Sequence, residues 1–270
     1  MHRHARTALA LGLALSLSSI AHAAELPSAR SLIDAHIAAV GGRDAIAEST
    51  DGTIKATLEI VEAGMKGDIS LYSLGADHLM TLNLPAAGET KTGYVGGVAW
   101  SINAMAGPRI LQGAEREQLI QQYDPKFVLR DATLLASATT TALSDSEGRP
   151  CYRVELKWTS GQTTADCYST ENGLLLSTES TIPSPMGELK QISHLSDYAP
   201  FGKYKIARTT RMKVAGMTQI IRIESIEATR PSADLFVLPA AIQALLKKAA
   251  AATPAAASAP APAETSTSSN

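Results

Sequence analysis

The chain has 270 residues, of which 24 are Lys or Arg and 26 are Asp or Glu, and its formal net charge is −2. This balance argues against general nucleic-acid binding. Aromatic residues make up 4% of the chain, which argues against a base-stacking RNA platform and an aromatic-girdled outer-membrane barrel.

The first 23 residues have the pattern of a secretory signal peptide. Arg3 and Arg6 precede an apolar run from Ala8 to Leu17, and Ala21 and Ala23 provide the small side chains that signal peptidase requires. The run is about ten residues long, against roughly 20 for a membrane-spanning helix. We therefore expect cleavage after Ala23 and a protein of the bacterial periplasm. Residue 24 is not a cysteine, so we expect no lipid anchor.

Residues 24–248 are expected to form one domain, because no Pro/Gly/Ser-rich linker and no internal repeat interrupt them. Residues 249–270 consist of Ala, Thr, Pro, Ser, Glu and Asn. This composition offers nothing large to bury, so it predicts a disordered tail.

The first half of the domain begins with helical spacing and then changes to strands. A helix starting at Ser28 or Ser31 is predicted to end before Gly41-Gly42, and a short second turn is predicted over residues 43–48. Apolar and polar residues alternate over 53–60, which indicates a strand with one dry and one wet face. Further strands are expected at 68–74, 78–84, 91–95 and 98–102.

The second half opens with a predicted helix over 113–123, which Pro125 should end. Residues 129–138 are compatible with a helix but carry no clear signal. Strands are then predicted at 151–158, 163–169, 174–182, 188–198, 204–214 and 217–228. The pattern predicts a mainly β (α+β) fold. We expect a single strongly curved antiparallel sheet, an incomplete barrel of about ten strands wrapped over short helices.

Cys151 and Cys167 are the only two cysteines, and disulfides persist in an exported protein. The predicted turn near Ser160-Gly161 lies almost midway between them, so we expect a disulfide across one hairpin. Both cysteines occupy odd positions, so the bridge should lie on the wetter face beside Arg153 and Glu155. The histidines are scattered and no metal-ligand spacing is present, so we expect no metal and no cofactor.

Arg208 falls on the predicted dry face of strand 204–214. It has two interpretations that the sequence leaves open. It is a strand-end side chain that reaches water, or it is a cation for an anionic head group.

Several short motifs resemble the LolA-like superfamily of periplasmic lipoprotein carriers. The helix over 37–46 followed at once by a long alternating strand resembles the family's start. The stretch YSTENGLL at 168–175 resembles its Y-D-x-x-T-G-L-L hairpin, and Asp197-Tyr198 resembles its D-Y turn. The stretch DLFVLP at 234–239 is similar to its D-x-F-x-L-P terminus. The similarity covers roughly residues 31–239.

This resemblance implies an incomplete barrel with a hydrophobic cavity for acyl chains. We therefore expect non-catalytic binding of a lipid or an acylated protein, exchanged with a membrane-bound donor or acceptor. The dry faces should line the cavity, with Arg208 near its mouth. The lining candidates are Ile54, Leu58, Ile60, Met80, Leu82, Trp100, Ile102, Met212 and Val214.

Two other function classes stay open. A curved sheet of this kind could act as a sensor or scaffold without lipid. A serine hydrolase is a remote alternative, because common nucleophile and metal motifs are absent from the sequence. The only acid and imidazole neighbours are Asp77-His78 and His194 with Asp197, beside Ser193 and Ser196. In a strand, Asp197 would point away from His194 and Ser196.

Overall fold

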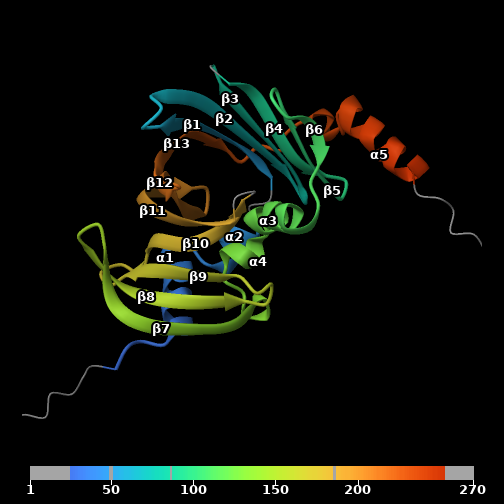
Figure 1. The fold of residues 1–270 in the computed structure, drawn as a ribbon. Helices are drawn as coiled ribbons and strands as arrows, with labels where there is room; N and C mark the ends of the chain where they lie inside the picture. The colour runs from blue at the N-terminus through green and yellow to red at the C-terminus, as the bar shows by residue number, and fades with distance from the viewer. Residues whose placement is uncertain (1–24, 49–50, 86, 185–186, 253–270) are drawn as a thin grey trace, which may run out of the picture.

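A computed structural model describes residues 25–48, 51–85, 87–184 and 187–252. The predicted signal peptide and most of the predicted tail lie outside these ranges. In the described part of the chain, thirteen strands form one open antiparallel sheet in the order β6-β5-β4-β3-β2-β1-β13-β12-β11-β10-β9-β8-β7. The sheet curves strongly, so that helices α3 and α4 lie inside the curve and α5 lies outside it (Figure 1). A mainly β fold built on one curved sheet is thereby confirmed.

The strands of the first half are β1 (Gly52–Ile60), β2 (Met65–Leu74), β3 (Asp77–Leu84), β4 (Gly88–Val95), β5 (Val98–Asn103) and β6 (Gly107–Ile110). Those of the second half are β7 (Leu135–Ser146), β8 (Arg149–Trp158), β9 (Thr163–Ser169), β10 (Leu175–Ser184), β11 (Gly187–Phe201), β12 (Tyr204–Val214) and β13 (Met217–Glu227). The helical elements are α1 (Ala29–Ala39), α2 (Arg43–Ala47), α3 (Gly113–Tyr123), α4 (Pro125–Val128), η1 (Ala132–Leu134), η2 (Ala233–Phe236) and α5 (Ala240–Ala252).

The expected count of about ten strands was too low, because β6 and β7 were not predicted. β6 has four residues, fewer than the usual strand signal needs. β7 begins near the end of the segment 129–138 that carried no clear signal, after the turn η1, and continues to Ser146. It is an edge strand rich in Ala, Thr and Ser, and its side chains are mostly exposed or partly exposed, so it lacks an apolar alternation.

Two helical boundaries also differ from expectation. Pro125 follows the end of α3, as expected, but it also begins α4. Proline is tolerated in the first turn of a helix, and the Asp124 side chain caps this one by accepting from the Lys126 N–H at 2.8 Å. Helix α5 was not predicted and runs to Ala252, past the expected start of the tail at residue 249. Alanine has the highest helix propensity, which accounts for this extension.

The core is divided between two regions of the sheet. Helix α1 packs on β8 and β9 through Ile33 and Ile37, which meet Val154, Leu156 and Tyr168. On the outer side of the first half, η2 and α5 contribute Phe236 and Ile242 to a cluster with Trp100. Among the described residues, no helix is long and apolar enough to cross a bilayer.

The predicted disulfide between Cys151 and Cys167 is confirmed, with a Cα–Cα distance of 5.5 Å. It links β8 and β9 on the face away from α1, which is the face of Arg153, as expected. The bridge is not at a wet surface, however. Cys151 is 0% and Cys167 is 6% exposed, because both pack with Leu176 of β10.

Candidate functional site

The inner side of the central strands carries a continuous aliphatic surface. Residues directly opposite in an antiparallel pair share a face. Leu71 lies opposite both Ile54 and Met80, and Ile221 lies opposite both Leu58 and Thr210. We call this surface the aliphatic face; its members are Ile54, Ala56, Leu58, Ile60, Ile69, Leu71, Met80, Leu82, Met212, Val214, Ile221 and Ile223.

Most of the aliphatic face is not covered by the rest of the protein. Ala56 and Leu58 are buried, but the other members are partly exposed. In the described part of the chain, none of them belongs to the clusters that hold the helices on the sheet. The opposite side of the same strands is polar, with Arg222 and Lys66 both paired to Glu59. The alternation therefore directs an open apolar surface toward the inside of the curve.

The aliphatic face continues into a cavity of about 610 Å³ beside helices α2, α3 and α4. Ile54 and Ile206 contribute from the sheet, and Ile46, Ile120 and Val128 contribute from the helices. This volume lies in the range of roughly 300–1,000 Å³ that small-molecule sites occupy. We call it the apolar cavity.

His78 and Tyr123 form an aromatic pair in the wall of the apolar cavity, whose lining also includes the polar residues Gln122 and Asp124. Their rings are stacked with centroids 4.3 Å apart, and His78 Nδ1 lies 3.0 Å from Ser73 Oγ. Burial lowers the pKa of His78, although Asp77 acts in the opposite direction. Burial raises the pKa of Tyr123 to about 12. Both groups are therefore neutral near pH 7, so this aromatic pair adds no charge to the cavity wall.

Seven of the predicted lining residues lie on the aliphatic face: Ile54, Leu58, Ile60, Met80, Leu82, Met212 and Val214. Trp100 and Ile102 do not, because they point to the outer side of the sheet. The indole of Trp100 lies over Gly93, where an added Cβ would meet the ring at 2.7 Å, and packs with Ile242 of α5. Both faces of β5 are covered by helices, so alternation alone could not identify the inner one.

Arg208 lies two residues before Thr210 and therefore on the same, inner side of β12. Its side chain is exposed. Its guanidinium is already engaged, because Nε and one terminal nitrogen donate to the Ile223 carbonyl at 3.2 and 2.9 Å. The same terminal nitrogen donates to the Glu224 carbonyl at 3.0 Å. These carbonyls lie where the β1–β13 register shifts, so Arg208 satisfies the backbone of an irregular strand.

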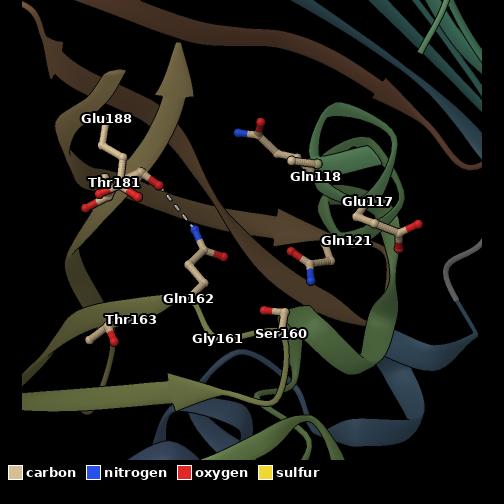
Figure 2. A pocket seen from close by; sticks show the side chains of 10 residues that line it. Glu117, Gln118, Gln121, Ser160, Gly161, Gln162, Thr163, Thr181 and Glu188 are labelled. Carbon is tan, nitrogen blue, oxygen red and sulfur yellow. Dashed lines mark hydrogen bonds between the residues drawn. The ribbon is translucent and has the colours of Figure 1, made fainter. Parts of the chain in front are cut away.

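A second pocket, of about 600 Å³, lies on the other side of helix α3; most of its lining side chains are polar, and Glu117 and Glu188 are charged. Figure 2 shows Gln118 and Gln121 extending from α3 toward Gln162 and Thr181, and Gln162 Nε2 donates to the Thr181 carbonyl at 3.4 Å. Ile120 and Tyr123 of the same helix line the apolar cavity. Helix α3 thus forms a wall of both pockets, with amide groups on one side and apolar groups on the other.

The residues considered for a hydrolase do not form a catalytic triad. His194 Nδ1 lies 3.2 Å from Ser146 Oγ, not beside Ser193 or Ser196, and its Nε2 is 3.8 Å from Glu147. Ser146 is 3% exposed, so a substrate carbonyl has no path to its hydroxyl. Glu147 also pairs with Arg211. Among the described residues, no group of His, Cys, Asp and Glu could hold a metal ion.

Sequence reasoning missed several residues of the site. Ile69 and Leu71 alternate with polar residues in β2 and could have been found from this pattern. Ile221 and Ile223 could not, because Ile220 precedes them and the register shifts near this point. The wall residues Ile46, Ile120 and Tyr123 come from helices whose position over the sheet depends on the tertiary fold.

Comparisons with solved structures identify the fold. A DUF1329 family protein from Desulfovibrio piger aligns with a TM-score of 0.54 and 13% identity, over 80% of this chain and 100% of that one. A LolA superfamily protein from Nitrosomonas europaea aligns with a TM-score of 0.51 and 12% identity, over 79% and 99% of the two chains. No family model matches the chain, and no curated protein matches it significantly in sequence. The predicted resemblance to the LolA superfamily is confirmed at the level of the fold.

Proposed function

We propose that this protein binds the acyl chain of a lipid or an acylated protein, without catalysis, on the aliphatic face and in the apolar cavity. One observation carries the proposal. Aliphatic side chains of five neighbouring strands stay partly exposed on the inner side of the sheet and lead into a cavity of about 610 Å³. A soluble protein rarely leaves a large contiguous apolar surface without a binding partner.

Burial of an acyl chain supplies enough free energy for such binding. Each methylene removed from water contributes about 0.8 kcal/mol, so a chain of ordinary length needs no charged or catalytic group to hold it. Met80 and Met212 on the aliphatic face have flexible side chains that adapt to an irregular apolar ligand. The neutral pair of His78 and Tyr123 at the cavity wall is compatible with the same kind of ligand.

The polar pocket on the other side of α3 supports an amphipathic ligand. Gln118, Gln121 and Gln162 each offer an amide donor and acceptor, and Glu117 and Glu188 add negative charge; this lining suits an uncharged head group or a zwitterionic one with an exposed cation. The signal-peptide pattern supports action in the periplasm. There the protein would receive its ligand from one membrane-bound component and deliver it to another.

The test is uptake of a fluorescent fatty-acid probe by two matched variants of β13. Ile221 lies on the aliphatic face, opposite Leu58, whereas Ile220 lies on the polar outer face, opposite Glu59; both are partly exposed. We expect Ile221→Glu to abolish probe uptake, because an unpaired charge on an apolar surface costs several kcal/mol when a chain covers it. Ile220→Glu should bind as the wild type does.

The proposal fails if the wild-type protein takes up no probe, or if Ile220→Glu lowers uptake as much as Ile221→Glu. Loss of folding is excluded by comparing the thermal unfolding of the two variants. A stoichiometric protein bound in place of a lipid would favour the sensor or scaffold alternative.

A further inference from the structure

Four neighbouring hairpin turns at one end of the sheet have unusually apolar sequences. They connect β12 to β13, β1 to β2, β3 to β4 and β5 to β6, and the strand order places all four on the same rim. We call these turns the apolar rim; its described members are residues 61–64, 85, 87, 104–106 and 215–217.

Packing between neighbouring strands holds the four turns of the apolar rim side by side along one edge of the sheet. The Val61 N–H donates to the Thr218 carbonyl at 2.9 Å, which joins the first two turns. Next to the turns, the strands pack closely: a Cβ added to Gly67 of β2 would lie 2.8 Å from the Leu84 side chain of β3, and one added to Gly88 of β4 would lie 3.2 Å from Ala104. The turns therefore stand side by side along the edge of the curve.

Large apolar side chains project from this rim into solvent. Met105 is 87% exposed, Val61 is 46% exposed and Met217 is 38% exposed. Glu62 is the one charged residue in the four turns, and its carboxylate accepts from the Thr218 N–H at 2.6 Å. Its charge is thus directed back to the neighbouring turn.

The opposite rim of the same strands is polar, so exposed apolar turns are not a general property of this sheet. Asp51 accepts from the Gly75 N–H at 2.8 Å, and Asp77 accepts from the Gly96 N–H at 2.9 Å. Lys203 in the β11–β12 turn pairs with Glu48 at 3.0 Å.

The apolar rim is also continuous with the aliphatic face. Ile60 lies opposite Met65, and Val214 lies opposite Met217, so the inward side chains nearest this rim are apolar. Paired strands are about 4.8 Å apart, so successive turns are roughly 10 Å apart and leave gaps between their tips. A protein partner needs a complementary contiguous surface of about 800 Å². A fluid lipid layer can surround each tip separately.

We propose that the apolar rim binds the surface of a lipid bilayer and directs the open end of the aliphatic face toward it. Val61, Met105 and Met217 enter the interface, where they bury apolar surface. Lys66, whose side chain is 76% exposed although it pairs with Glu59 at 3.7 Å, and the exposed Lys213 lie directly behind the turns, within reach of the phosphates of anionic lipids. This inference rests on the turns alone and does not require a ligand on the aliphatic face.

The test is flotation of the purified protein with phosphatidylcholine vesicles, with and without phosphatidylglycerol. We expect wild-type protein to float, more strongly with the anionic lipid, and Val61→Asp/Met105→Asp to bind at least about tenfold more weakly because two apolar contacts are lost. Leu143→Asp is the matched control, since Leu143 is 62% exposed but lies on β7 at the far edge of the sheet. It should bind within twofold of wild type.

A second readout uses Met105→Cys and Leu143→Cys labelled with a polarity-sensitive dye, because the two native cysteines are held in a disulfide. Only the label at position 105 should shift to the blue with vesicles. The inference is overturned if wild type does not float, if Leu143→Asp weakens binding as much as the rim variant, or if the rim variant changes only self-association in sedimentation. Probe uptake by the rim variant in solution should be unchanged, which separates this test from that of the proposed function.

Discussion

Asp166 is a fully buried carboxylate whose partners come from three parts of the chain. Arg130 Nε donates to it at 2.8 Å, and the Tyr168 and Thr178 hydroxyls each donate at 2.8 Å. The Arg130 side chain is 14% exposed and Asp166 is 0% exposed, so the pair is well shielded from water. It fixes the segment after α4 to β9, and thereby holds one wall of the apolar cavity in place.

We predict that Asp166→Ala destabilises the protein by roughly 3–5 kcal/mol, because it leaves the Arg130 charge buried without its partner. The control is Glu179→Ala, which removes the Arg153–Glu179 pair, where the side chains are 35% and 45% exposed. That change should cost about 1 kcal/mol or less. Urea unfolding measures both, and equal losses in the two variants would contradict this account.

His36 gives the protein a dependence of stability on pH. Burial, and next the charge of Arg130, lower the pKa of His36 to about 4, against 6.5 for a free histidine. Its Nδ1 accepts from the Leu175 N–H at 3.1 Å, which requires the neutral ring. Below about pH 6.5 the unfolded chain binds a proton at His36, whereas the folded protein does not bind it until about pH 4. The contribution of His36 to the free energy of unfolding is therefore fully present above pH 6.5 and decreases as the pH falls.

We expect His36 to account for a loss of about 2 kcal/mol in unfolding free energy between pH 7.5 and pH 5. In His36→Gln this part of the loss should vanish, while the smaller contributions of the other buried histidines remain. Parallel denaturation curves at the two pH values test this. An unchanged pH dependence in the variant would show that His36 does not carry the effect.

At the scale of elements, regular alternation made most strands predictable. Strand β1 has apolar residues at every second position, and its predicted bounds differ from the structure by one residue. The edge strand β7 lacks such a pattern, because even its less exposed positions from Ala138 to Ser146 carry small or polar side chains. Helix α5 was missed because its alanine-rich sequence continues into the tail, although Ile242 is completely buried.

Helix α5 is therefore predicted to stabilise the first half of the sheet. Ile242 is 0% exposed and packs in the cluster of Leu79, Trp100 and Phe236. Ile242→Ala should cost about 2–5 kcal/mol, whereas Lys247→Ala, at an exposed position of the same helix, should cost about 0.5 kcal/mol or less. Thermal unfolding of the two variants decides this, and an equal, small effect would mean that α5 is dispensable.

At the scale of the whole molecule, the curved sheet separates two environments. Its outer side is covered by α5 at β3 to β5 and carries ion pairs such as Arg222–Glu59 at β1 and β13. Its inner side is packed against α1 at β8 and β9 and is aliphatic along the central strands. Seven lining residues could be predicted because their strands β1, β3 and β12 have one polar, solvent-facing side, which makes the apolar side recognisable from the alternation. The cavity itself could not be predicted, because α3 and α4, which form much of its wall, are far from β1 in the sequence.

The most direct measurement is the native mass of protein purified from cells without detergent, followed by lipid extraction. We predict about one lipid or acylated ligand per chain in the wild type, retained in Ile220→Glu and lost from Ile221→Glu, because only the second substitution places a charge on the aliphatic face. Wild-type protein that carries no lipid and takes up no fatty-acid probe would contradict the central claim.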